Sequence, residues 1–124
     1  MSDESILLHV TARKHLASIR SEGLRPGAYF TNRGAIAAYY AETVRDEREE
    51  PVVIEVNLRK LNARRLAPDN PGLEEPITTV LGMDEDEVWA KWSEGPRTAL
   101  SCLELIGSIR YRSRVPAKLL RLPD

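Results

Sequence analysis

Residues 6–31, which read ILLHVTARKHLASIRSEGLRPGAYFT, decide the fold. The run Ile6–Val10 is short, apolar and partly β-branched, which predicts a buried strand. Thr11 stands where a helix N-cap belongs, and apolar residues at helical spacing follow it as far as Gly23, which suits the left-handed position after a helix. A second short strand is expected at Ala28–Thr31. The opening therefore predicts a strand, a helix and a strand in close succession.

The next segment continues the alternation of helix and strand. Thr31 or Asn32 is placed to cap a helix over about residues 33–44. Val52–Val56 carries the strongest strand pattern of the chain, and Leu61–Leu66 is a weaker strand candidate. These elements extend the predicted sheet to three or four strands.

The second half of the chain begins with a loop or helical insertion at about residues 68–105. Within it, helices are predicted over 84–92 and 98–105, the first with acidic residues in its opening turn. A last strand is expected over 108–113, followed by a tail strand or ordered coil over 115–122. The whole order predicts an α+β fold with a split, mostly antiparallel sheet and flanking helices.

Composition limits the class of protein. The 124 residues (1–124) suffice for one domain, and 42% hydrophobic with 30% charged residues is typical of a soluble globular chain. The net charge of −1 gives no reason to expect a nucleic-acid or membrane partner. Cys102 is the one cysteine, which excludes a disulfide within the chain and a cysteine-based metal cluster, so no metal is expected. No signal peptide or membrane span is visible, and we expect a cytoplasmic protein.

Several motifs occur in a known order. Leu8-His9-Val10-Thr11 and Glu22-Gly23-Leu24-Arg25-Pro26-Gly27 are followed by Gly27-Ala28-Tyr29-Phe30-Thr31 and Ala38-Tyr39-Tyr40. This combination resembles the opening of the ADP-ribosyltransferase superfamily, and its tyrosine segment resembles the poly-ADP-ribose polymerase branch. The closing Ile109–Arg112 and Val115-Pro116 are similar to the last strand and tail of small members. The resemblance implies the superfamily's fold, with NAD as the substrate and no metal.

The resemblance also implies a role for each motif residue. The rings of Tyr29 and Tyr40 would hold the flat, cationic nicotinamide by stacking and cation–π attraction. His9 would bond the neighbouring ribose, while Val10 would meet the carboxamide. The remaining implied contacts to NAD come from Thr11, Phe30 and Thr31. Without this resemblance, His9 would be interpreted as a core histidine and the tyrosines as core aromatics. The order and spacing of the three residues along the sequence favour the functional interpretation.

The reactive acid of the superfamily is absent from its usual position. Departure of nicotinamide leaves a cationic sugar that a carboxylate normally stabilises, and the superfamily places this glutamate at the start of the last strand. The strand over 108–113 has no acid, and Glu104 is the nearest one upstream, so Glu104 is the candidate. Arg110, Arg112 and Arg114 alternate along the strand, either as a solvated face or as contacts to phosphate or nucleic acid.

Three functions follow from these observations. The leading one is an NAD-dependent mono-ADP-ribosyltransferase acting on a protein or nucleic-acid acceptor, with His9, Tyr29 and Glu104 as catalytic residues. Small stand-alone proteins that this chain resembles are often toxins, phage effectors or defence proteins. The second is an enzyme similar to RNA 2′-phosphotransferases, which lack the late glutamate and bind phosphates with arginines. The third is a non-catalytic module that binds ADP-ribose, nucleic acid or a protein.

Overall fold

The fold is α+β, with a six-stranded antiparallel sheet flanked by helices, as the sequence predicts. The computed structural model describes residues 6–74, 76–95 and 97–123. The strand order is β4-β5-β2-β1-β3-β6. The strands are β1 (Ile6–Ala12), β2 (Ala28–Thr31), β3 (Pro51–Asn57), β4 (Leu66–Pro68), β5 (Ser108–Tyr111) and β6 (Leu120–Arg121). The α-helices are α1 (Leu16–Glu22), α2 (Gly34–Asp46), α3 (Ile77–Val80), α4 (Glu85–Ser93) and α5 (Ala99–Ile106). Short 3₁₀ turns lie at Arg13–His15, Leu58–Lys60, Ala63–Arg65, Pro71–Leu73 and Ala117–Leu119.

The two central strands of the sheet, β1 and β2, are paired over only a short length. Strand β1 pairs with β3 along its whole length, from Ile6 opposite Asn57 to Ala12 opposite Pro51. In contrast, β1 and β2 share a single pair, Leu8 with Thr31. The two strands therefore separate beyond Leu8, and the separation opens a space in the middle of the sheet.

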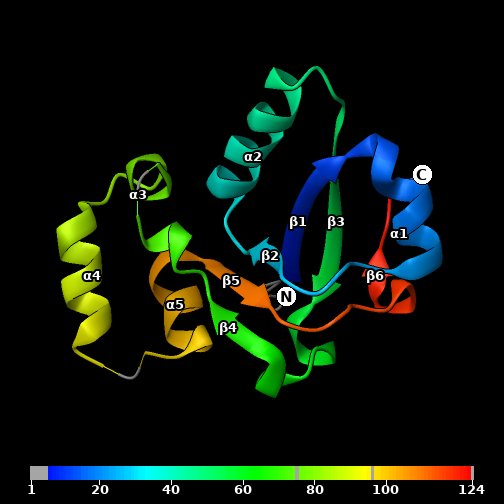
Figure 1. Cartoon of the computed structure of the whole chain (residues 1–124). Helices are drawn as coiled ribbons and strands as arrows, with labels where there is room; N and C mark the ends of the chain where they lie inside the picture. The colour runs from blue at the N-terminus through cyan, green and yellow to red at the C-terminus, as the bar shows by residue number, and fades with distance from the viewer. Residues whose placement is uncertain (1–5, 75, 96, 124) are drawn as a thin grey trace.

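The main core lies on the side of the sheet that receives the alternate residues of β1, β3 and β5. Its members include Leu7, Ile54 and Ile109, all fully buried, together with Leu16 of α1 and Leu103 of α5. Helix α2 contacts β1 and β3 and stands beside them in Figure 1.

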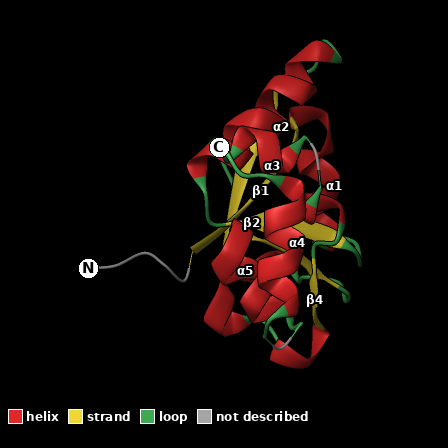
Figure 2. Ribbon diagram, turned by 90° about the vertical axis from the view of Figure 1, so that its left-hand side faces the viewer, coloured by secondary structure: helices red, strands yellow, loops and turns green. Residues whose placement is uncertain are grey.

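The predicted insertion is helical and has its own apolar cluster. Helices α3, α4 and α5 lie together beyond β4 and β5, at the opposite end of the molecule from α1 and β6, and face the viewer in Figure 2. Trp92 packs with Cys102 and Ile106, and its indole Nε1 donates to Ser101 Oγ at 3.1 Å. Both predicted helices are present, because local caps specify their starts. Asp84 accepts from the Glu87 N–H at the start of α4, and a capping box of Thr98 with Ser101 begins α5.

Three predictions about local structure are wrong. The strand predicted over Leu61–Leu66 is absent except for Leu66, the first residue of β4, because the side chains of Asn57 and Asn62 accept backbone N–H groups two residues on and fold the chain before β4 into 3₁₀ turns. Thr11 is not a helix cap, since its pairing with Val52 keeps it in β1. Neither Thr31 nor Asn32 caps α2, whose N-cap is Arg33 without a side-chain bond.

Candidate active site

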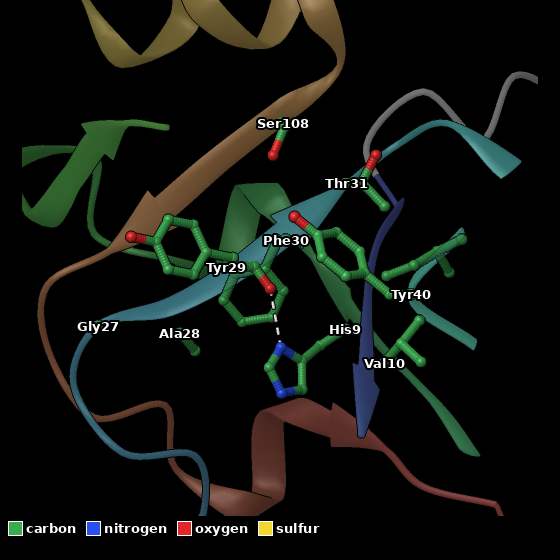
Figure 3. A pocket seen from close by; sticks show the side chains of 10 residues that line it. His9, Val10, Gly27, Ala28, Tyr29, Phe30, Thr31, Tyr40 and Ser108 are labelled. Carbon is green, nitrogen blue, oxygen red and sulfur yellow. Dashed lines mark hydrogen bonds between the residues drawn. The ribbon is translucent and has the colours of Figure 1, made fainter. Parts of the chain in front are cut away.

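A pocket of about 310 Å³ opens in the separation between β1 and β2. Figure 3 shows its side chains converging from both strands, from α2 and from β5. The structure brings together most of the residues that the sequence selects for NAD binding. These are His9, Val10, Tyr29, Phe30, Thr31 and Tyr40, and Leu8, Gly27, Ala28 and Ser108 complete the lining.

His9 lies at the edge of this pocket and is held in one tautomer. Its Nδ1 is 2.8 Å from the carbonyl oxygen of Tyr29, drawn as a dashed line in Figure 3. A carbonyl only accepts, so Nδ1 carries the proton and Nε2 keeps its lone pair. Burial lowers the pKa of His9 below its ordinary value of 6.5, more than the bond to Tyr29 raises it. The neutral imidazole is therefore favoured, with an acceptor nitrogen directed away from Tyr29.

The two predicted tyrosines flank the pocket (Figure 3). Tyr29 is 39% exposed, while Tyr40 comes from α2 and is half-buried. Burial raises the pKa of Tyr40 to about 12, with smaller contributions from the charges of Asp69, Tyr39 and Tyr29. Tyr39 packs edge-on against Tyr40 at 5.4 Å between ring centroids and so supports it from outside the pocket. The pocket thus has two aromatic walls, one of them with a hydroxyl that stays protonated.

A carboxylate that the sequence analysis did not select backs the pocket. Ser108, at the start of β5, is 2% exposed and donates its hydroxyl to Asp69 Oδ2. Asp69 is 1% exposed, and its Oδ1 accepts the Gly72 N–H at 2.9 Å. Within the described residues Asp69 makes no ion pair. A buried carboxylate without a cation is costly to keep, and such groups concentrate at functional sites.

Sheet pairing brings Asp69 to this position. Strand β4 pairs with β5, which sets Pro68 opposite Ile109 and leaves Asp69, the next residue, beside Ser108. Gly72 permits the arrangement, because a Cβ there would stand 2.5 Å from Asp69 Oδ2. The sequence signal was the Pro-Asp-Asn-Pro-Gly run at 68–72, which reads as an ordinary turn. Only the pairing of two segments 39 residues apart shows that its acid is buried beside the pocket.

The other predicted acid lies elsewhere. Glu104 is exposed on α5 and borders a separate hollow with Lys91 and Trp92. It is not among the residues that line the pocket of His9 and Tyr29.

The three predicted arginines lie outside the lining of this pocket and remain exposed. Arg110 pairs in register with Tyr29, and its guanidinium lies against Gly27 at the pocket edge. Arg112 donates to the Arg64 carbonyl, and Arg114 donates to a backbone carbonyl of α1 at 2.8 Å. Only Arg110 therefore stands next to the pocket itself.

A second hollow of about 370 Å³ adjoins the first. The two share His9, Gly27 and Ala28. The second is more polar, and it is here that Thr11 is found, together with Arg25 and Arg114. Thr31 does not offer its hydroxyl to either space, because the hydroxyl donates to the Gly107 carbonyl at 2.5 Å and accepts from the Arg33 N–H.

Comparison of the chain with protein families and with curated proteins identifies no relative. No protein-family model matches the chain, and no curated protein is significantly similar to it. Over the described ranges no group of three or more histidine, cysteine or acidic residues is placed to hold a metal ion. No helix in that part of the chain has the length and apolar character needed to cross a membrane.

Proposed function

We propose that the protein is an NAD-dependent ADP-ribosyltransferase that cleaves the bond between nicotinamide and ribose. One observation carries the proposal. A pocket with aromatic walls is backed by a buried carboxylate–hydroxyl pair, Asp69 with Ser108, and adjoins a polar hollow. This arrangement supplies a place for an aromatic cation, a negative charge beside it and room for a polar remainder.

The dimensions suit a dinucleotide that spans both spaces. Ligand pockets commonly measure about 300–1,000 Å³, and each of the two spaces here is at the lower end of that range. Nicotinamide stacks between Tyr29 and Tyr40, because a cationic ring is attracted to aromatic faces. The polar hollow with Thr11, Arg25 and Arg114 takes the diphosphate and adenosine half, for which guanidinium groups are well matched. His9, shared by the two spaces, accepts a hydrogen bond from a ribose hydroxyl at Nε2.

The reaction is a substitution at C1′ of the nicotinamide ribose. The C1′–nitrogen bond breaks, and its electron pair stays on the nicotinamide nitrogen, which becomes neutral. The negative charge of Asp69 stabilises the cationic sugar that develops. The acceptor's oxygen or nitrogen forms the new bond to C1′, its proton passes to Ser108 Oγ, and the proton of Ser108 moves to Asp69. Water as the acceptor gives hydrolysis by the same steps.

A second candidate is transfer of an RNA 2′-phosphate to NAD. The guanidinium of Arg110 at the pocket edge favours it, since an arginine beside the ribose site is placed to bind such a phosphate. Incubation of a 2′-phosphorylated oligonucleotide with NAD and the protein tests this option. Retention of the phosphate on the oligonucleotide removes it.

The test of the leading proposal is nicotinamide release from NAD, followed by chromatography, together with transfer of label from adenylate-labelled NAD. We expect release by the wild type, with a loss of roughly 10–100-fold in His9→Ala, which removes a hydrogen bond to the ribose, and of about 3–10-fold in Tyr29→Ala, which removes a stacking face. Equal rates in the three proteins, or no release at all, contradict the proposal. Binding of NAD without release assigns the pocket to a non-catalytic binding module instead.

A further inference from the structure

The basic residues of this nearly neutral chain are unevenly distributed. Residues 56–68 and 105–123 contain no aspartate or glutamate, yet they hold half of the chain's 18 lysine and arginine residues. All of these cations are exposed in the structure. Although the net charge of the whole chain is −1, these two segments are therefore strongly basic.

The fold joins the two acid-free segments along one edge of the sheet. Strand β4 pairs with β5, the Arg112 N–H donates to the Arg65 carbonyl at 2.8 Å, and the Arg112 guanidinium donates to the Arg64 carbonyl at 3.3 Å. Arg110 lies opposite Ala67 of β4 and opposite Tyr29 of β2. We call this edge the basic surface. It consists of Arg64, Arg65, Arg110 and Arg112, to which we add Arg59 and Lys60 of the 3₁₀ turn that precedes Arg64 in the chain.

The basic surface is not neutralised by the protein. The ion pairs of the structure lie away from it, joining Arg13 and Lys14 to acids before β3 and joining two residues of α2. Among the described residues, none of the six cations of the basic surface makes an ion pair. Ordinary surfaces mix the two signs of charge, whereas an extended surface of one sign attracts an oppositely charged partner.

The basic surface reaches the mouth of the pocket. Arg110 lies against Gly27, a pocket residue, and is the register partner of Tyr29. From Arg110 the surface continues through Arg112 to the turns that hold Arg64 and Arg65. A partner bound along this edge therefore presents its groups directly to the pocket.

We propose that the acceptor of ADP-ribose is a single-stranded nucleic acid held along the basic surface, an inference that rests on the proposed function. Five of the six cations are arginines, whose planar fork matches phosphate geometry. A phosphate backbone supplies the repeated charge that an acidic peptide offers only in short runs. The strand is single because the Ser108 hydroxyl is buried, so a base must leave any stack to reach it.

The transfer step follows the chemistry of the pocket. A base nitrogen or a hydroxyl of the strand forms a bond to C1′ of ADP-ribose while the bond to nicotinamide breaks. Nicotinamide leaves with the electron pair, and the proton of the nucleophile passes through Ser108 to Asp69. No further reactant is needed.

The experiment compares the variant Arg64→Gln/Arg65→Gln with a control that removes equal charge, Arg45→Gln/Arg48→Gln, in the last turn of α2 and in the turn that follows it. Binding of fluorescent single-stranded DNA and RNA of random sequence is followed by anisotropy over a salt series. Label transfer from NAD to the same strands, to their duplexes and to lysate proteins is measured in parallel. Nicotinamide release without any acceptor serves as the readout of the proposed function.

The expected results are specific. For single strands each phosphate contact contributes about 0.7 to the slope of log affinity against log salt, so the basic-surface variant loses about 1.4 from that slope. We expect its transfer to single strands to fall at least about tenfold, with release unchanged and with the control equal to the wild type. Transfer to lysate proteins only, equal transfer to duplexes, or equal slopes in both variants overturn the inference. Absence of nicotinamide release in the wild type overturns the proposed function, and the binding data still decide the basic surface separately.

Discussion

Replacing Asp69 by asparagine separates the reactive role that we propose for this side chain from its role in the fold. The substitution keeps the shape and removes the charge. Asparagine Oδ1 still accepts the Gly72 N–H, and its amide nitrogen donates to the Ser108 hydroxyl, which turns to accept it. The Ser108 hydroxyl hydrogen, which Asp69 accepts in the wild type, loses that acceptor in the variant.

The substitution changes the free energy of unfolding in two opposite ways. A hydrogen bond to a charged group contributes about 1.5–3 kcal/mol and a neutral one about 0.5–1.5 kcal/mol, so weakening two bonds costs about 2 kcal/mol. Burying an unpaired carboxylate costs several kcal/mol, which the substitution removes. The lost acceptor of the Ser108 O–H costs a further 1–3 kcal/mol, roughly, so these opposing effects nearly cancel and Asp69→Asn is expected to stay close to the wild type in stability. Loss of the charge next to the developing sugar cation slows nicotinamide release about 100–1,000-fold, or about 2.7–4 kcal/mol.

The matched control is Glu104→Gln, the same change of charge at the exposed acid of α5. Urea unfolding gives the stability and nicotinamide release gives the activity of the three proteins. We expect Glu104→Gln to equal the wild type in both. Slow release in Glu104→Gln with normal release in Asp69→Asn refutes the assignment to Asp69. Loss of stability and activity together in Asp69→Asn assigns that residue to the fold alone.

Three further predictions concern His9, two glycines and Tyr29. Because burial lowers the pKa of His9, the unfolded chain binds its proton more tightly, so this residue's contribution to stability is complete above pH 6.5 and is lost as the pH falls below that value. Urea unfolding of His9→Gln is expected to show a shallower fall of stability over this range than the wild type, and parallel curves contradict the burial. Gly23→Ala is expected to lose about 2–4 kcal/mol in the same assay, since φ is 78° and a Cβ would stand 2.1 Å from the Val115 carbonyl oxygen. Gly34→Ala, with open space at its Cβ and a place in α2, is expected to gain up to about 1 kcal/mol, and a similar result for both glycines refutes the explanation. Tyr29→Phe should keep the affinity for NAD in calorimetry, whereas Tyr29→Leu should weaken it about 3–10-fold through lost stacking; equal affinities argue against an aromatic wall.

Sequence reasoning located the elements whose ends are marked by local chemistry. Helices α4 and α5 begin at Asp84 and Thr98, which cap their own first turns. Periodicity also predicts β3, since burial alternates along that strand. These features depend on residues close in the sequence.

Features set by distant pairing could not be predicted. Thr11 has the chemistry of a cap, yet its ladder bonds with β3 keep it in a strand. The separation of β1 from β2, which makes the pocket, is visible only when the single pair of Leu8 with Thr31 is known.

The residues of the candidate site also differ in whether the sequence predicts them. His9, Tyr29 and Tyr40 were placed by their register, and the structure brings them together around one pocket. The pattern of the last strand does not predict Asp69, because this acid follows β4 and reaches Ser108 only through the pairing of β4 with β5. Its partner Ser108 lies within the predicted last strand, and its hydroxyl connects the pocket to the carboxylate.

The most direct test of the central claim is the structure of the protein bound to an NAD analogue whose bond between nicotinamide and ribose cannot be cleaved. We predict that the nicotinamide ring lies between Tyr29 and Tyr40, with C1′ of its ribose facing Ser108 and the diphosphate beside Arg25 and Arg114. An analogue bound away from the separation of β1 and β2, or seated there with its nicotinamide ribose turned from Ser108 and Asp69, contradicts the account.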